Sequence, residues 1–264
     1  MSWRSLFLLP KLVRTARGAP RDRESAWDRY WSRVGETGRE GHVLWDGESA
    51  DEHAWLLAVV RRTMDAARPL VDVGCGNGRY TRALAPWFPR VIGVDVSTEA
   101  VARAARESAD VHERRASFRV LDMTRPGAGA QLREELGGAN VFVRGLFHTL
   151  EPERCRALVA NCHALVSAGG VLVLVETDYP GGPLAYLEFL GARGSDFPEP
   201  VLRCIASGLP TPRRFGEREV AAFFPNTHWE SIERGATTLH SAVMRPGHPP
   251  LRIPAHYAVL RARS

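Results

Sequence analysis

The sequence predicts an α/β fold in which helices cover both faces of one mostly parallel, seven-stranded sheet, a doubly wound arrangement. Between residues 70 and 176, short apolar runs typical of buried strands alternate with amphipathic helical patterns five times. Two further strand patterns occur within residues 229–262. With 264 residues and 44% hydrophobic content, the chain can bury one large core, and no linker-like stretch divides it. We therefore expect a single domain over residues 1–264.

The first strand pattern covers residues 70–73 and runs directly into a glycine turn. Asp72 lies in the strand, and glycines follow at alternate positions as Gly74, Gly76 and Gly78. Glycine adopts backbone angles that a Cβ forbids, and it lets a bulky ligand lie against backbone N–H groups. A helix is expected next, because apolar residues recur at near-helical spacing: Tyr80, Leu84 and Trp87. This order of strand, turn and helix predicts a nucleotide-binding unit.

The next two strand patterns also end in carboxylates. Residues 91–95 end at Asp95, and an acid at the end of a second strand can accept hydrogen bonds from both ribose hydroxyls. Ser97 then offers a cap for a helix through residues 101–105. The third strand, residues 118–121, ends in the pair Asp122 and Met123.

The spacing of the glycines distinguishes between nucleotide classes. A dinucleotide fingerprint needs its third glycine three residues after the second, and that position is Arg79. A nucleotide-dependent oxidoreductase is therefore disfavoured. The pattern Asp-x-Gly-x-Gly-x-Gly instead resembles the first motif of class I S-adenosylmethionine (SAM) dependent methyltransferases, in the small-molecule group of that family. The resemblance covers residues 50–264 and is strongest over residues 70–123.

The resemblance implies SAM as cofactor, S-adenosylhomocysteine as product, and a role for each motif residue. Asp72 would orient the amino-acid end of SAM, usually through water or loop amides. Asp95 would bind the ribose, Asp122 would accept a hydrogen bond from the adenine amine, and Met123 would pack near the base. The other cofactor contacts expected are Gly74, Cys75, Gly76, Val96 and Arg144.

The fourth strand region, residues 141–150, contains the candidate catalytic residue His148. An imidazole can exchange a proton near neutral pH, so His148 could act as a general base for a hydroxyl acceptor. It could equally be a structural histidine near the cofactor. Many relatives begin this strand with Asp, whereas this chain has Asn140, which argues against a carboxylate at that point in the chemistry. A helix through residues 158–165 and a strand over residues 171–175, ending in Glu176, follow.

Two segments outside the sheet are expected to cover the site. We name residues 1–50 the lid segment and residues 178–215, inserted after the fifth strand, the cap segment. The lid segment supplies the aromatic candidates for acceptor binding, which are Tyr30, Trp31 and Trp45, although they could only anchor the lid to the core. The cap segment begins with a further candidate, Tyr179; it could close over an apolar acceptor or be extra core. A helix over residues 217–224 and two antiparallel strands, residues 229–244 and 251–262, complete the pattern.

The first 17 residues of the chain mix basic and apolar side chains, and Pro10 interrupts an apolar run too short to span a bilayer. We expect no stable membrane insertion. Packing over the substrate site or against a neighbouring subunit is favoured over weak binding to a membrane surface, which leaves a homodimer open.

The net charge of +5 is carried almost wholly by arginine, since Lys11 is the only lysine. The arginines are scattered and interleaved with acids, whereas nucleic-acid binding favours a concentrated stripe, so we expect no nucleic-acid partner. The four cysteines form no CxxC pair, which predicts reduced thiols, a cytoplasmic protein and no metal site. They are Cys75, Cys155, Cys162 and Cys204.

These observations together predict SAM-dependent methyl transfer to the oxygen or nitrogen of a small, partly apolar molecule, such as a specialised metabolite. SAM already carries an activated methyl group, so the protein has chiefly to align the acceptor with it. The alternative is a SAM-binding protein that catalyses a rearrangement or cyclisation without methyl transfer, or that acts as a sensor.

Overall fold

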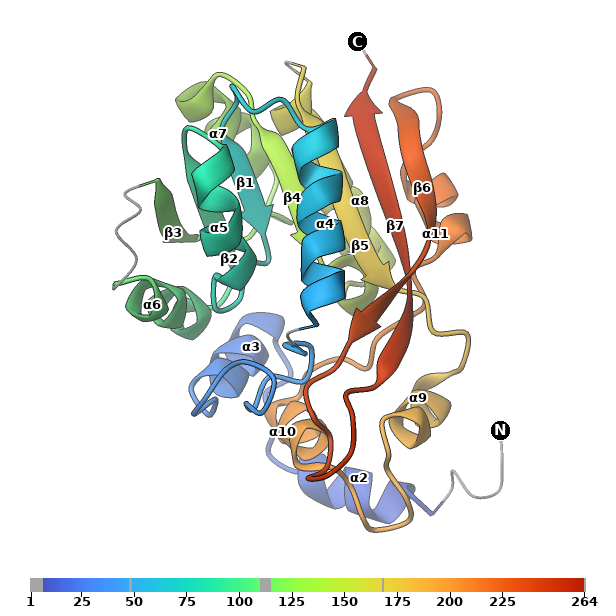
Figure 1. Ribbon diagram of the computed structural model, residues 1–264. Coiled ribbons are helices and arrows are strands. Elements are labelled where there is room, and N and C mark those ends of the chain that lie inside the picture. The colour runs from blue at the N-terminus through green and yellow to red at the C-terminus, as the bar shows by residue number, and fades with distance from the viewer. Residues whose placement is uncertain (1–6, 48, 110–114, 168, 264) are drawn as a thin grey trace.

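A computed structural model describes residues 7–47, 49–109, 115–167 and 169–263. Its centre is a seven-stranded sheet in the order β3-β2-β1-β4-β5-β7-β6 (Figure 1). The strands β1 to β5 are parallel, and β7 runs antiparallel between β5 and β6. The predicted mostly parallel, seven-stranded sheet is therefore confirmed. The strands are β1 (Leu70–Val73), β2 (Val91–Asp95), β3 (Ala116–Val120), β4 (Asn140–Arg144), β5 (Val171–Thr177), β6 (Trp229–His240) and β7 (Arg252–Ala262).

The register of the sheet brings the functional strand ends to one edge. Leu70 pairs with Val91 on one side and with Asn140 on the other, so β1, β2 and β4 start at the same level. The chain order reverses at β1, which has the second strand on one side and the fourth on the other. Ligands of doubly wound sheets bind at such a reversal, beyond the carboxyl ends of the strands.

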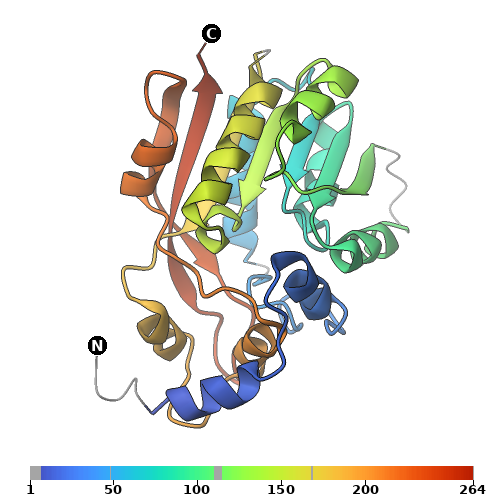
Figure 2. The ribbon, with the colours of Figure 1, turned by 180° about the vertical axis from the view of Figure 1, so that it is seen from behind.

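Helices cover both faces of the sheet, as expected (Figures 1 and 2). On one face, α4 (Ala50–Thr63) and α5 (Arg79–Leu84) pack through residues such as Leu56 and Leu84. On the other face, Leu132, Leu158 and Val220 belong to α7, α8 and α11 and share a second core cluster with the sheet. The bounds of those helices are α7 (Ala128–Leu136), α8 (Pro152–Val166) and α11 (Glu217–Phe223), and α6 (Thr98–Glu107) follows β2.

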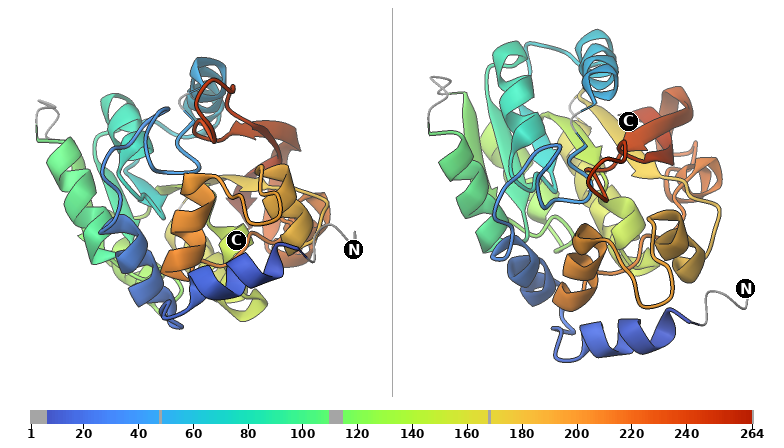
Figure 3. Two further views of the ribbon diagram at one scale, coloured as in Figure 1. Left: turned by 90° about the horizontal axis from the view of Figure 1, so that it is seen from below. Right: turned by 60° about the horizontal axis from the view of Figure 1, so that its bottom comes forward.

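The remaining helices gather beyond the carboxyl ends of the parallel strands, below the sheet in Figure 1 and toward the viewer in Figure 3. The lid segment contributes α2 (Leu9–Ala16) and α3 (Arg23–Trp31), and the cap segment contributes α9 (Pro183–Phe189) and α10 (Glu199–Ser207). Helix α10 contacts both α2 and α3, and α3 also contacts α6. Two segments far apart in the sequence therefore lie side by side.

Two predicted elements end at least three residues earlier than expected. The helix after the glycine turn ends at Leu84, and the chain continues as the 3₁₀ helix η1 (Ala85–Trp87), because Pro86 cannot donate a helical hydrogen bond. The strand predicted over residues 229–244 ends at His240. Beyond it, the amide of Ala242 donates to Leu44 O at 2.8 Å, so the chain leaves β7 to pair with the lid segment.

Among the described residues, none of the helices is long and apolar enough to cross a membrane. Cys155 and Cys162, on α8, are buried in the second core cluster, and burial raises the pKa of the Cys162 thiol to about 12. These two thiols therefore pack as small core residues.

Candidate cofactor and acceptor site

A cavity lies at the carboxyl edge of the sheet, under the lid and cap segments. Its wall on the β1–β3 side includes Gly74, Gly76, Asp95, Asp122 and Met123. Its other wall is formed mostly by apolar side chains from α9, α10, β6 and β7. The lining therefore divides into a polar part and an apolar part.

The glycine turn forms the floor of the polar part. Gly74 and Gly76 have φ angles of +77° and +54°, which side chains of L-residues rarely adopt. A Cβ at Gly76 would lie 2.8 Å from Cζ2 of Trp31, so the indole packs directly on the turn. Cys75, predicted as a cofactor contact, is buried outside the lining, and its amide donates to Val94 O at 3.1 Å.

Asp95 is held at the cavity wall by the turn beside it. Its carboxylate accepts hydrogen bonds from the amide of Gly76 at 3.0 Å and from the amide of Ser97 at 2.9 Å. Burial raises the pKa of Asp95, and these two amides partly offset that effect. Val96, the next residue, also lines the cavity. Each oxygen of Asp95 accepts one of these hydrogen bonds and keeps further acceptor capacity, and because Asp95 lines the cavity, hydroxyl donors could bind there.

Asp72 supports the turn from behind and does not line the cavity. The hydroxyl of Thr81 donates to its carboxylate at 2.5 Å. Burial raises the pKa of Asp72 to about 7. Any influence of Asp72 on a ligand would act through loop amides or water, as the resemblance implies.

Asp122 is already engaged by the lid segment. Its Oδ1 accepts from Nη2 of Arg23, on α3, at 2.6 Å and from the amide of Thr124 at 2.9 Å. Burial opposes ionisation of Asp122, but the hydrogen bonds from Thr124 and the charge of Arg23 hold its pKa below the usual value. The other oxygen, Oδ2, forms a longer ion pair with Nη1 of Arg154, at 3.6 Å. A ligand amine could therefore reach Oδ2 while Arg23 keeps Oδ1.

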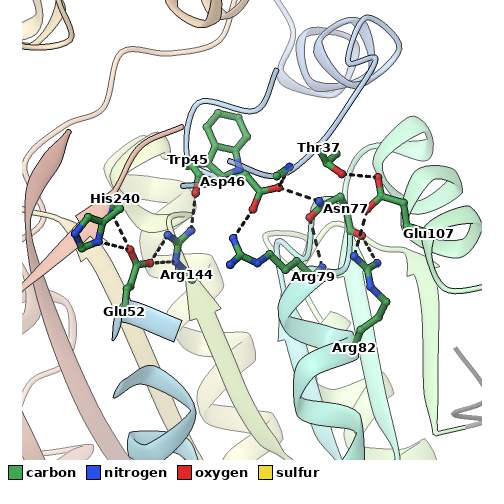
Figure 4. Close-up of polar contacts among 11 residues, drawn as sticks. Thr37, Trp45, Asp46, Glu52, Asn77, Arg79, Arg82, Glu107, Arg144 and His240 are labelled. Atoms are coloured by element: carbon green, nitrogen blue, oxygen red, sulfur yellow. Dashed lines mark hydrogen bonds and ion pairs between the residues drawn. The ribbon is translucent and has the colours of Figure 1, made fainter. Parts of the chain in front are cut away.

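Arg144, predicted as a cofactor contact, lines the cavity but is paired within the protein (Figure 4). Its guanidinium donates to Oε1 of Glu52 at 2.5 Å and to Trp45 O at 3.3 Å. The amide of His240 donates to the other oxygen of Glu52 at 2.7 Å. Burial opposes ionisation of Glu52, but Arg144 and His240 together lower its pKa. This buried pair ties α4 to β4 and to the end of β6.

A second buried carboxylate, Asp46, ties the lid segment to the first helix after the glycine turn. Arg79 donates to Asp46 Oδ1 at 2.6 Å, and Asn77 donates to Oδ2 at 3.2 Å (Figure 4). The amide of Gly38 also donates to Oδ2, at 2.9 Å. Arg79, the residue that replaces the third glycine of the dinucleotide fingerprint, therefore fixes the lid segment over the turn.

The aromatic residues of the lid segment form one cluster with two roles. Trp27, Trp31 and Trp45 line the cavity. Tyr30 is fully buried behind them and stacks on Trp45, with ring centroids 5.1 Å apart. Of the three predicted acceptor-binding aromatics, Trp31 and Trp45 therefore reach the cavity, whereas Tyr30 supports them.

The cap segment faces the cavity with a different tyrosine from the predicted one. Tyr179 lies outside the lining, where its ring packs on Phe189 and its hydroxyl donates to Ala185 O at 3.2 Å. Tyr186, on α9, lines the cavity instead. Further side chains of the apolar part include Leu44, Leu187, Leu190, Val201, Cys204, Ile205, Leu209, Pro210, Pro212, Leu239 and Ile253.

His148 lies where the two parts of the lining meet. It follows β4, on the 3₁₀ helix η2 (Phe147–Thr149), and lines the cavity although it is only 8% exposed. Its Nδ1 lies 2.6 Å from Oε2 of Glu176, a residue that is fully buried in β5. Sequence reasoning found Glu176 only as the end of a strand and did not link it to His148.

Comparisons with known proteins agree with this architecture. A family model described as a methyltransferase domain matches residues 70–170. The crystal structure of a SAM-dependent methyltransferase from Anabaena variabilis superposes with a TM-score of 0.78 at 29% identity, covering 93% of this chain and 97% of that one. These matches support a class I SAM-dependent methyltransferase, a class whose cofactor is SAM.

Two curated relatives match over short stretches. The chain is 38% identical over 71 residues to the dTDP-3-amino-3,6-dideoxy-alpha-D-glucopyranose N,N-dimethyltransferase of Streptomyces fradiae, covering 26% of this chain and 28% of that protein. It is 37% identical over 60 residues to a probable SAM-dependent methyltransferase of Saccharomyces cerevisiae, covering 23% of this chain and 20% of that protein. The match therefore spans less than a third of each of these two relatives.

Proposed function

We propose that this protein transfers a methyl group from SAM to a small, partly apolar molecule. The observation that carries the proposal is one cavity with two unlike parts, a glycine turn with two strand-end carboxylates on one side and apolar cap residues on the other. The carboxylates of Asp95 and Asp122 suit the hydroxyl and amine donors of a nucleoside. The apolar part suits an acceptor that buries carbon surface.

SAM supplies an electrophilic methyl carbon, so the chain has chiefly to hold the acceptor in line and exclude water. In the proposed arrangement, Asp95, Asp122 and the glycine turn bind the cofactor. The indoles of Trp31 and Trp45 cover it. His148, between the two parts, would remove a proton from a hydroxyl acceptor.

The test is to incubate the protein with SAM and a panel of apolar alcohols, phenols and amines. Mass spectrometry should detect one added methyl group on an acceptor, together with S-adenosylhomocysteine. The Gly76→Val variant, which we expect not to bind SAM, is the negative control. SAM binding without any methylated product would favour the alternative of a non-methylating catalyst or a sensor.

A second measurement tests His148. If it is the base for a hydroxyl, His148→Ala should lower turnover by about 10²–10⁴-fold with little change in SAM affinity. The wild-type rate should rise with pH through one ionisation that the variant lacks. A variant within a few-fold of the wild-type rate would contradict the role of His148 and leave alignment as the catalytic device.

A further inference from the structure

We infer that Glu176 is a positioning residue that fixes the tautomer of His148, and that the site is therefore built to methylate a neutral hydroxyl on an apolar scaffold. This inference rests on the proposed function and deepens it. It combines the hydrogen bonds of Glu176 with the distribution of charge around the cavity.

Glu176 is saturated with donors. Its Oε1 accepts from the amides of Leu146 and Phe147, each at 3.0 Å, and its Oε2 accepts from the amide of His148 at 3.2 Å. The fourth contact, 2.6 Å long, is to Nδ1 of His148. Side-chain and backbone contacts together hold η2 against the end of β5, so the imidazole has one orientation.

The contact also fixes which ring nitrogen carries the proton. A carboxylate offers only lone pairs, so the short contact needs a proton on Nδ1 of His148. In the neutral ring, Nε2 is then an unprotonated acceptor. Within the described part of the chain, Nε2 has no hydrogen-bond partner, and His148 lines the cavity. The lone pair of Nε2 is therefore available to a bound molecule.

The proton and electron balance follows from this tautomer. The acceptor hydroxyl gives its proton to Nε2, and an oxygen lone pair forms the bond to the methyl carbon of SAM as the carbon–sulfur bond breaks, both electrons of that bond remaining on sulfur. The imidazolium that forms lies against the carboxylate of Glu176, which stabilises it. His148 later returns the proton to water.

The charges around the cavity favour a hydroxyl over an amine. The arginine and acidic side chains in the lining are Arg23, Asp95, Asp122 and Arg144, all from the lid segment or from the ends of β2, β3 and β4. The apolar part contains no carboxylate among the described residues. An alkylamine would have to enter as an ammonium and lose its hydration without a partner, whereas a phenol or alcohol enters uncharged.

The first experiment reads the tautomer directly, without a substrate. In a ¹⁵N-imidazole spectrum of the full chain with S-adenosylhomocysteine bound, assigned with His148→Asn, neutral His148 should carry its proton on Nδ1. Glu176→Gln should abolish that preference and lower kcat by at least about tenfold, while the Kd of S-adenosylhomocysteine changes less than twofold. A proton on Nε2 in the wild-type protein would overturn the inference.

Glu176→Gln could fail to fold, because its amide nitrogen would face backbone donors. Cys155→Ala provides a milder change next to η2 from outside the cavity lining, since the buried Cys155 thiol donates to Phe147 O at 3.5 Å. If Cys155→Ala and Glu176→Gln lose melting temperature and turnover in the same proportion, Glu176 is only structural. Loss of turnover beyond that proportion, in Glu176→Gln alone, supports positioning.

The second experiment compares para-butylphenol with para-butylbenzylamine on the protein saturated with S-adenosylhomocysteine, at neutral pH. The phenol should bind at least about tenfold more tightly, and with SAM it should be methylated faster. Tighter binding or faster methylation of the amine would overturn the hydroxyl assignment while leaving methyl transfer intact. Binding of neither probe would contradict the proposed acceptor cavity itself.

Discussion

Asp95 and Asp122 are both strand-end carboxylates, but they use their oxygens differently. Asp95 is fixed by two backbone amides, from Gly76 and Ser97, and carries no ion pair within the described residues. Asp122 shares one oxygen with Arg23 of the lid segment. Asp95 is therefore the residue at which a substitution reports most directly on ligand binding.

We expect Asp95→Ala to weaken SAM binding by about 1–3 kcal/mol, because two ribose hydroxyls would lose a charged acceptor. Isothermal titration calorimetry measures the change. Glu134→Ala, an exposed acid on α7, is the control and should bind SAM normally. Unchanged affinity in a folded Asp95→Ala protein would disprove the ribose assignment.

Asp72 gives a pH-dependent prediction. Its pKa is about 7 in the folded chain against an ordinary aspartate value of 3.8, so between these values the folded state holds a proton that the unfolded state has lost. The contribution of Asp72 to stability is therefore fully present below about pH 4 and disappears as the pH rises through about 7.

Asp72→Asn removes this titration while keeping an oxygen for the Thr81 hydroxyl. The melting temperature of Asp72→Asn relative to the wild type should therefore increase between pH 4 and pH 7.5, values chosen to bracket the two pKa values. Thermal melts of both proteins across this range provide the measurement. A constant difference in melting temperature would show that Asp72 does not titrate there.

The glycine turn and α3 act as one unit at the scale of elements. Trp31, on α3, lies so close to Gly76 that a Cβ would contact its ring at 2.8 Å. The lid segment is therefore in contact with the same turn that would carry the cofactor. A side chain at Gly76 would obstruct both the ligand and the indole.

Gly76→Val should abolish SAM binding, since a branched side chain cannot easily adopt a φ of +54° and would also displace Trp31. Gly182→Val is a matched control, because its Cβ position has nothing within 4 Å and its φ is not positive. Circular dichroism verifies the fold and calorimetry the affinity. Wild-type affinity in Gly76→Val would remove the turn from the cofactor site.

Most of the sheet could be predicted from the sequence because its strands are buried on both faces. β1 and β5 are buried at every position, so their residues are apolar apart from Asp72 in β1 and the last two residues of β5, Glu176 and Thr177. The end of β6 could not be predicted, because its continuation pairs with Leu44, about 200 residues earlier in the chain. Tertiary pairing of that kind leaves no local pattern.

Only those residues of the candidate site that lie at the ends of parallel strands could be placed together from the sequence. Carboxyl ends of parallel strands share one edge, so Asp95 and Asp122 could be placed together from their positions alone. The pairing of Glu176 with His148 spans 28 residues and that of Arg23 with Asp122 spans 99. These contacts depend on packing between elements. The same is true of the cavity lining, which contains Tyr186 and not the predicted Tyr179.

In the whole molecule, the lid and cap segments cover the cavity together. Helix α10 supports α2 and α3 of the lid segment and also lines the cavity through Val201, Cys204 and Ile205. Asp46 and Glu52, both buried, tie the lid segment and α4 to α5 and β4. Excision of the cap segment would therefore also disturb the lid segment, so a point substitution is the sharper test.

We expect the apolar part of the cavity to accommodate the acceptor independently of SAM. Ile205→Trp should fill that part, because Ile205 lines the cavity from α10 and its side chain is only partly buried. The KM for para-butylphenol should rise at least about tenfold, while the Kd for SAM changes less than twofold. Ala206→Trp, at the next position of the helix and outside the lining, controls for the bulk of the indole.

If both variants, once shown to be folded, keep the wild-type KM, the cap segment does not contact the acceptor. If both lose SAM affinity, the two parts of the cavity are not separable, and α10 contributes to cofactor binding through α3.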